Sequence, residues 1–271
     1  MTETSVLWLR VAAILYSLGL ASAILMLTQR RERLFRAALL SFSFGALFHL
    51  VSIVEQGVSL HALPVQSIFE SMSLCAWIIT VAFLIVCRRY RAESLSVFIF
   101  PLVFIMTMVA ALSKPVDSWS SLAFRNAWLS AHIVSALLAY GSLVLTAVAA
   151  VVYLFQEKQL KKKLPSAISH RLPPLGTLDE LITRSLAIGF GFMTGSLVAG
   201  SIWAFIELGT RWIGEPRITI SFITWGIYLA MVFFRASAGW RGRKAAIMAL
   251  VALVCSALTW AAHARLESRL S

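Results

Sequence analysis

Long runs of apolar residues, separated by short polar segments, recur along the whole chain. A hydrocarbon core about 30 Å thick takes roughly 20 apolar residues for one helical crossing, and the apolar runs reach that length. They predict helices over these approximate ranges: 5–28, 37–56, 66–87, 95–113, 127–156, 182–209, 218–236 and 243–263. The runs are continuous and do not alternate with a period of two residues, which excludes a β-barrel. We therefore predict an all-α polytopic membrane helix bundle of about eight transmembrane helices.

The composition supports this prediction. Of the 271 residues, 59% are hydrophobic and 13% are charged, and the mean hydropathy is +0.84; soluble domains carry about 25% charged residues. The net charge of +12 is spread over short clusters between the apolar runs. That placement favours contact with the anionic lipid of a bilayer, and we expect no nucleic-acid partner. Residues 1–271 are expected to form a single integral membrane domain.

Basic residues follow an alternating pattern along the chain. The segments 29–36, 88–93, 157–184 and 235–244 hold 17 of the 24 Lys and Arg residues. Because loops rich in these residues favour the cytoplasm, the four segments are predicted to be cytoplasmic and both termini to lie outside. No basic residue precedes the first apolar run, which favours a retained helix over a cleaved signal. This pattern predicts a multi-pass protein of the bacterial inner membrane.

Four of the five histidines fall in the predicted outer third of the bundle. His49 lies within the second helix, His61 in the loop after it, His132 one turn inside the fifth helix and His263 at the end of the eighth. Imidazole is a common ligand for haem iron, and polar side chains within a membrane span are usually functional. A lone membrane histidine is more often an interhelical hydrogen-bond donor than a ligand, and His61 could be a solvated loop residue. The convergence predicts a haem-handling site, with His132 paired to His263 or His61.

Aromatic and basic residues also gather on the outer side. The tryptophans expected there are Trp119, Trp128, Trp203, Trp212 and Trp260. They fit an ordinary interfacial belt or an apolar wall for a porphyrin. Arg125, Arg211 and Arg217 fit solvated loop charges or partners for the two propionates of a haem, because a guanidinium binds a carboxylate with two parallel hydrogen bonds.

The stretch from Gly200 to Trp225 carries closely spaced motif residues. It contains Gly200-Ser-Ile-Trp203, then Gly209, Trp212, Glu215-Pro216-Arg217 and Phe222-Ile223-Thr224-Trp225. This segment, at about 200–225, resembles the tryptophan-rich signature of the cytochrome c assembly proteins of CcsA/ResC type, with Glu-Pro-Arg in place of Asp-Pro-Lys. Two other stretches look like further segments of that family: Trp128-x-x-x-His132, and Ile68-Phe69-Glu70-Ser71.

The resemblance implies a function and a set of site residues. It implies a non-enzymatic protein that binds b-type haem non-covalently and transiently, and presents it at the outer face for cytochrome c maturation. The implied partners are a membrane subunit of CcsB/ResB type and apocytochrome c. The implied cofactor-binding residues are His132, His263, His49, Trp203, Trp212, Arg211, Arg217, Glu215 and Trp225, with the haem iron on His132 and His263.

Some residues depart from the family pattern. Phe233 stands where a second membrane histidine is expected, and Gly214 and Ile220 replace two signature tryptophans. The run from Gly239 to Arg243 resembles the shortened HemX/YpjD branch. These departures favour an alternative, a regulatory or scaffolding membrane subunit of the same fold without haem transport. A small-molecule transporter is a third class, but the chain lacks the internal repeat that many transporters have.

Overall fold

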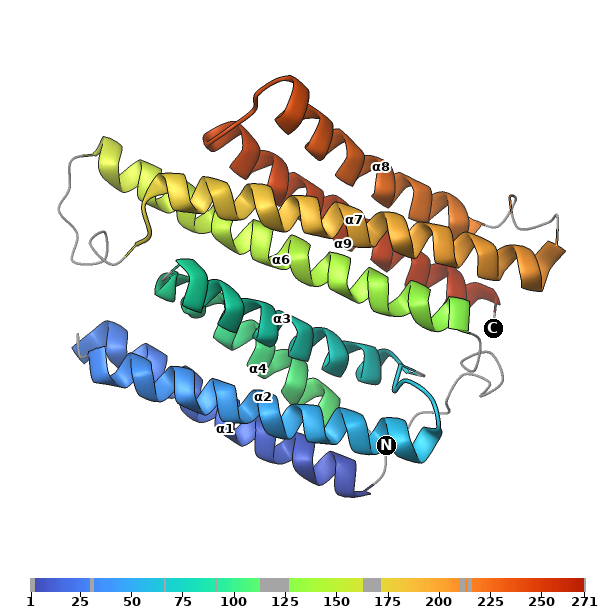
Figure 1. Cartoon of the computed structure of the whole chain (residues 1–271), viewed down its shortest axis with the longest axis horizontal. Coiled ribbons are helices and arrows are strands. Elements are labelled where there is room, and N and C mark those ends of the chain that lie inside the picture. Colours follow the sequence, from blue (N-terminus) through green and yellow to red (C-terminus); the bar gives the residue numbers. More distant parts are fainter. Residues whose placement is uncertain are drawn as a thin grey trace. The chain divides into compact units, whose positions relative to one another are not determined.

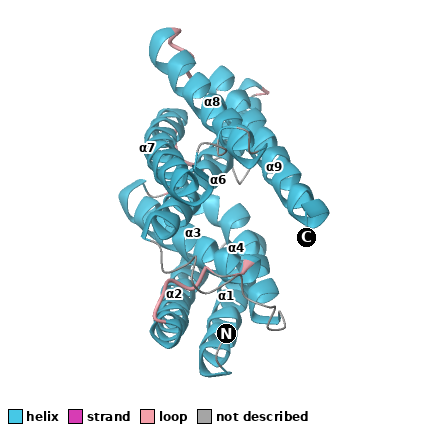
Figure 2. Cartoon of the chain, turned by 90° about the vertical axis from the view of Figure 1, so that its right-hand side faces the viewer, coloured by secondary structure: helices cyan, strands magenta, loops and turns pink. Residues whose placement is uncertain are grey.

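The computed structural model describes most of the chain. The described residues are 3–29, 32–65, 67–90, 92–112, 127–162, 172–209, 213 and 216–270. Within the helices, the described side chains exclude those of residues 26–29, 32–33, 208, 216–217 and 259–270. This part of the chain forms helices joined by short loops and contains no strand (Figure 2). The all-α prediction is confirmed.

The helices in the described ranges follow the predicted order. The α-helices are α1 (Glu3–Gln29), α2 (Glu32–Leu60), α3 (Ile68–Tyr90), α4 (Ser96–Leu112), α6 (Ala127–Lys161), α7 (Leu175–Leu208), α8 (Pro216–Ser237) and α9 (Arg243–Leu270). A short 3-10 helix, η1 (Glu93–Leu95), precedes α4. Every predicted helix has its counterpart, and most of the observed helices are longer than the apolar run that predicted them.

The largest difference from the predicted boundaries lies in the segment 157–184. The sequence predicted a sizeable loop there, but α6 continues to Lys161 and α7 already begins at Leu175. The end of α6 is supported by an ion pair of 2.7 Å between Lys161 Nζ and Glu157 Oε1, one turn apart. Polar helical turns therefore extend two of the membrane helices beyond their apolar parts.

The first compact unit, Met1–Arg125, contains α1 to α4. Contacts join α1 to α2 and α4, and α3 to α2 and α4, which gives a four-helix arrangement (Figure 1). Aromatic rings fill its centre: Phe42 lies 4.8 Å from Tyr16 between ring centroids and also stacks on Phe100. Gly45 allows α1 and α2 to approach, because a Cβ atom there would lie 2.7 Å from Tyr16 Cε1.

The second compact unit, Asn126–Ser271, contains α6 to α9. Here α6 packs on α7 and α9, while α8 packs on α7 and α9 (Figure 1). Because successive helices are antiparallel, the ends of α6 and α8 lie with the beginnings of α7 and α9. This common end carries basic residues, among them Lys161, Arg184, Arg235 and Arg243. The basic residues that alternate along the sequence thus gather at one end of the unit.

The outer surfaces of both units suit a lipid environment. Among the described residues, seven helical stretches are long and apolar enough to cross a membrane, namely α1, α2, α3, η1 with α4, α6, α7 and α8. Large apolar side chains point outward along them, for example Ile14 on α1 at 60% exposure and Leu112 on α4 at 67%. Water-soluble monomers seldom expose contiguous apolar surface of this extent. The prediction of a polytopic membrane bundle is confirmed; the outside location of the termini remains a prediction.

Candidate functional site

His132 is held in a fixed orientation between α6 and α7. Its Nδ1 atom lies 2.8 Å from the backbone oxygen of Ser196. A backbone carbonyl only accepts hydrogen bonds, so Nδ1 carries the proton and donates it. The neutral ring then has its lone pair on Nε2, and Nε2 has no hydrogen-bond partner among the residues that the structure describes. The half-buried imidazole is therefore oriented and keeps one nitrogen available as a ligand.

Gly200 on α7 packs against this imidazole, and Trp203 lies about one turn further along the helix. A Cβ atom on Gly200 would lie 2.5 Å from His132 Nδ1, so only glycine permits the ring to pack there. Trp203 follows three residues later on the same face of α7. Its Nε1 atom is buried and lacks a hydrogen-bond partner within the described part of the chain. An unpaired buried donor of this kind fits a ligand with acceptor oxygens.

Trp225 belongs to a different contact. Its Nε1–H donates to Thr194 Oγ1 at 3.1 Å, and its ring stacks on Phe190 with centroids 6.1 Å apart. Thr194 and Ser196 are two residues apart in a helix, so they point to different sides of α7. Trp225 and His132 therefore pack on different sides of α7, and the observed role of Trp225 is to join α8 to α7.

His49 lies in the first unit and is fully enclosed. Its Nε2 atom is 2.8 Å from Ser73 Oγ, and its Nδ1 atom is 3.4 Å from the Tyr16 hydroxyl. The side chain is 0% exposed. Both ring nitrogens therefore have polar partners that join α2 to α1 and α3, which is the hydrogen-bonding alternative that the sequence left open for each histidine.

The remaining predicted site residues are placed only in part. Arg211, Trp212 and Glu215 lie outside the described residues. Arg217 lies on α8 and His263 on α9, with side chains outside the described part. His61 lies in the first unit at the end of α2; it is exposed and has a positive φ of 51°.

Glu70 is buried, which its position in the first turn of α3 did not reveal. Gln56 Nε2 donates to Glu70 Oε1 at 2.5 Å, and the backbone N–H of Glu70 donates to Ser67 Oγ at 3.2 Å. In the sequence, Glu70 stood out only as part of the Ile68-Phe69-Glu70-Ser71 segment that resembles the family. The contact with Gln56 depends on how α2 and α3 pack, so no local signal in the sequence predicts it.

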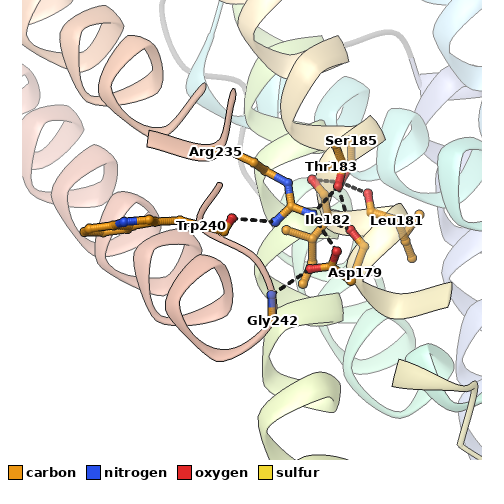
Figure 3. Close-up of polar contacts among 8 residues, drawn as sticks. All are labelled: Asp179, Leu181, Ile182, Thr183, Ser185, Arg235, Trp240 and Gly242. Carbon is orange, nitrogen blue, oxygen red and sulfur yellow. Dashed lines mark hydrogen bonds and ion pairs between the residues drawn. The ribbon is translucent and has the colours of Figure 1, made fainter. Parts of the chain in front are cut away.

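A second polar cluster lies at the basic end of the second unit and was missed from the sequence. Arg235 Nη2 on α8 is 2.9 Å from Asp179 Oδ2 on α7, and the backbone N–H of Gly242 donates to Asp179 Oδ1 at 2.9 Å. Arg235 also donates to Thr183 Oγ1 (Figure 3). The available signal was a pair of adjacent acids, Asp179 and Glu180, in a basic segment. This cluster fixes the turn between α8 and α9 against α7.

Known proteins provide independent information. Residues 65–261 match the model of a family described as cytochrome C assembly protein. A cytochrome c biogenesis protein CcsA of Prochlorococcus marinus strain MIT 9301 is 30% identical over 253 residues, which cover 83% of this chain and 82% of the relative. A CcsA of Chlamydomonas reinhardtii is 27% identical over 195 residues, covering 69% of this chain and 54% of that protein.

The fold also has a counterpart among solved structures. The chain named Cytochrome c Heme Lyase CcmF matches with a TM-score of 0.68 and 18% identity. The match covers 94% of this chain and 46% of CcmF, so this chain spans less than half of that structure. At this identity the likeness concerns the fold alone. The resemblance seen in the motifs is confirmed by the family match and the relatives: the chain belongs to the cytochrome c assembly protein family.

Proposed function

We propose that this chain is a non-enzymatic membrane protein that binds haem and presents it at the outer face of the bacterial inner membrane during cytochrome c maturation. The observation that carries the proposal is the orientation of His132. Its Nδ1–H bond to the Ser196 carbonyl is the arrangement usual for histidines that ligate a metal through the other nitrogen. Haem is the cargo, and the protein contributes ligation, orientation and exclusion of water.

The surroundings of His132 suit the other parts of a haem. The buried Nε1–H of Trp203 lacks an acceptor in the described part of the chain, and a propionate oxygen would provide one. Trp128 lies one turn before His132 on the same face of α6 and is 44% exposed. Its indole offers an apolar surface next to the proposed iron ligand.

The rest of the proposed site comes from the family resemblance. Arg211 and Arg217 would bind the propionates, and Trp212 and Glu215 would complete the tryptophan-rich segment. His263 would provide the second axial nitrogen. A membrane subunit of CcsB/ResB type would bind alongside, and apocytochrome c would accept the haem. In this proposal Trp225 supports the site by positioning α8 through Thr194.

Haem titration of the detergent-purified full chain tests the proposal. The wild-type chain should gain a Soret band, and His132→Ala should lower the affinity for haem by about tenfold or more, a loss of about 1.4 kcal/mol of binding free energy. Added imidazole should restore the band of the variant. His170→Ala makes the same substitution in the segment predicted to be cytoplasmic and should leave the titration unchanged. The proposal would be refuted if the wild-type chain gained no Soret band. It would also be refuted if the haem titration of His132→Ala were identical to that of the wild-type chain.

A second candidate function is that of a scaffolding membrane subunit. It is supported by two residues within the membrane-spanning helices. The nitrogens of His49 already have partners, and Phe233, at the position of the second membrane histidine, is 58% exposed on α8. This candidate predicts that the chain co-purifies with another membrane protein from cells depleted of haem. Stoichiometric haem in the isolated chain would rule it out.

A further inference from the structure

A cavity of about 500 Å³ lies between α7 and α8 at the basic end of the second unit. The two helices diverge towards this end (Figure 1). Three arginines line the cavity: Arg184 on α7, Arg235 at the end of α8 and Arg241 in the turn that follows. The haem-handling proposal for His132 uses none of these residues.

The charges around the cavity leave one cation without a carboxylate. Arg235 is paired with Asp179, and Arg184 Nη2 is 2.7 Å from Glu180 Oε1. Within the described part of the chain, Arg241 has no acidic side chain within ion-pair distance. The cavity wall therefore carries an excess positive charge, and its guanidinium groups have more N–H donors than the two carboxylates use. A phosphate-type anion is the ligand that this donor set favours.

The cavity also has an apolar wall, formed by Ala187 on α7 and by Val232 and Ala236 on α8. Ala187 lies about one turn after Arg184, and Val232 lies about one turn before Arg235. Ala187 and Val232 therefore lie further from the charged end than the arginines, towards the apolar parts of the two helices. A ligand that fills the cavity therefore has an anionic group at one end and an apolar portion at the other.

Two further features favour a lipid as this ligand. Trp240 stacks on Phe234 with centroids 4.8 Å apart, and Lys244 Nζ lies 5.7 Å from the Trp240 ring centre. Aromatic and basic side chains of this kind occupy the head-group level of a bilayer. Haem is also anionic and apolar, but no lining residue supplies an imidazole, thiol or thioether to its iron.

We propose that this cavity binds the phosphate-bearing head group and upper acyl chain of an anionic phospholipid. Arg241 is the main contact for the phosphate. The pairing of Asp179 with Arg235 and the Gly242 N–H holds the charged end of the cavity in shape (Figure 3). The positive-inside pattern of the chain places this lipid in the cytoplasmic leaflet, where anionic lipids attract basic segments.

Native mass spectrometry of the full detergent-purified chain tests the lipid site. The probes are phosphatidylglycerol, phosphatidylcholine and inorganic phosphate. The wild-type chain should retain phosphatidylglycerol about fivefold more strongly than phosphatidylcholine, and Arg241→Gln should remove that preference. Ala187→Phe, which narrows the apolar wall, should weaken retention of both lipids. Arg243→Gln is the matched control, because Arg243 is exposed, lies two residues away and does not line the cavity.

The possible results separate the lipid from other ligands. Equal retention of the two lipids by the wild-type chain would overturn the proposal, as would an equal effect of Arg243→Gln and Arg241→Gln. Displacement of phosphatidylglycerol by millimolar inorganic phosphate would identify a site for a free anion instead. A haem Soret band that survives in His132→Ala and is lost in Arg241→Gln would assign the cavity to haem and reject the lipid.

Discussion

His132 and Ser196 exchange hydrogen bonds in both directions across the α6–α7 contact. The imidazole Nδ1–H donates to the Ser196 backbone oxygen at 2.8 Å, and the Ser196 hydroxyl donates to the His132 backbone oxygen at 3.1 Å. The first bond fixes the tautomer of the ring, and the second fixes the spacing of the two helices. A ligand nitrogen that is oriented before haem arrives loses little conformational entropy on binding.

Gly200→Ala should weaken haem binding although it replaces none of the proposed haem ligands. The new methyl group would lie 2.5 Å from His132 Nδ1, so the ring must move. We expect a loss of about tenfold in haem affinity, or about 1.4 kcal/mol, measured by titration of the Soret band. Gly191→Ala is the control on the same helix, because a Cβ atom there meets nothing within 4 Å. Equal affinities of the two variants would contradict the predicted crowding.

Ser196→Ala should have a much smaller effect than His132→Ala on the haem spectrum. The substitution removes the hydroxyl contacts with His132 but keeps the backbone oxygen that accepts the Nδ1–H bond. We expect the free energy of unfolding to fall by about 1 kcal/mol and the Soret maximum to stay in place. Loss of the band in this variant would mean that the hydroxyl, and not the carbonyl, orients the ring.

Ser73→Ala should destabilise the first unit. It removes the partner that lies 2.8 Å from His49 Nε2 and leaves a buried imidazole nitrogen unpaired. The expected cost is about 1–3 kcal/mol, seen as a lower thermal midpoint in detergent. Ser17→Ala is the control, because that hydroxyl is exposed and bonds within its own helix to the Ile14 backbone oxygen. Equal midpoints would show that His49 does not depend on Ser73.

Two neighbouring acids of α7 should differ sharply in their contribution to stability. Asp179→Asn weakens a pair whose arginine, Arg235, is only 10% exposed, whereas Glu180→Gln affects a pair whose members are 59% and 47% exposed. We expect a loss of about 2 kcal/mol for the first variant and less than about 0.5 kcal/mol for the second. Thermal melts of both variants measure the difference, and equal losses would contradict the assigned roles.

The sequence predicted the helices well because length and apolar content decide a membrane crossing. It missed the first turns of α7, since Asp179 and Glu180 interrupt the apolar run although the backbone is already helical there. Hydropathy indicates only the part of a helix that lies inside the lipid. The helix itself continues as long as its backbone hydrogen bonds continue.

For the candidate site, residue types were predictable and contacts were not. His132, Gly200 and Trp203 stood out as members of spaced motifs. The packing of Gly200 against His132 depends on the relative rotation of α6 and α7, which spacing along the chain does not fix. The same holds for Arg235 and Asp179, which are 56 positions apart, and for the partners of His49. Contacts between side chains of different helices therefore could not be predicted from the sequence.

The central claim, that His132 ligates haem iron, is tested most directly by the electron paramagnetic resonance spectrum of the ferric haem-loaded chain. His132→Cys replaces the imidazole by a thiol, and His170→Cys makes the same change elsewhere. The first variant should lose the wild-type signal or gain a thiolate-type signal, while the second should retain the wild-type spectrum. A wild-type spectrum in His132→Cys would contradict it.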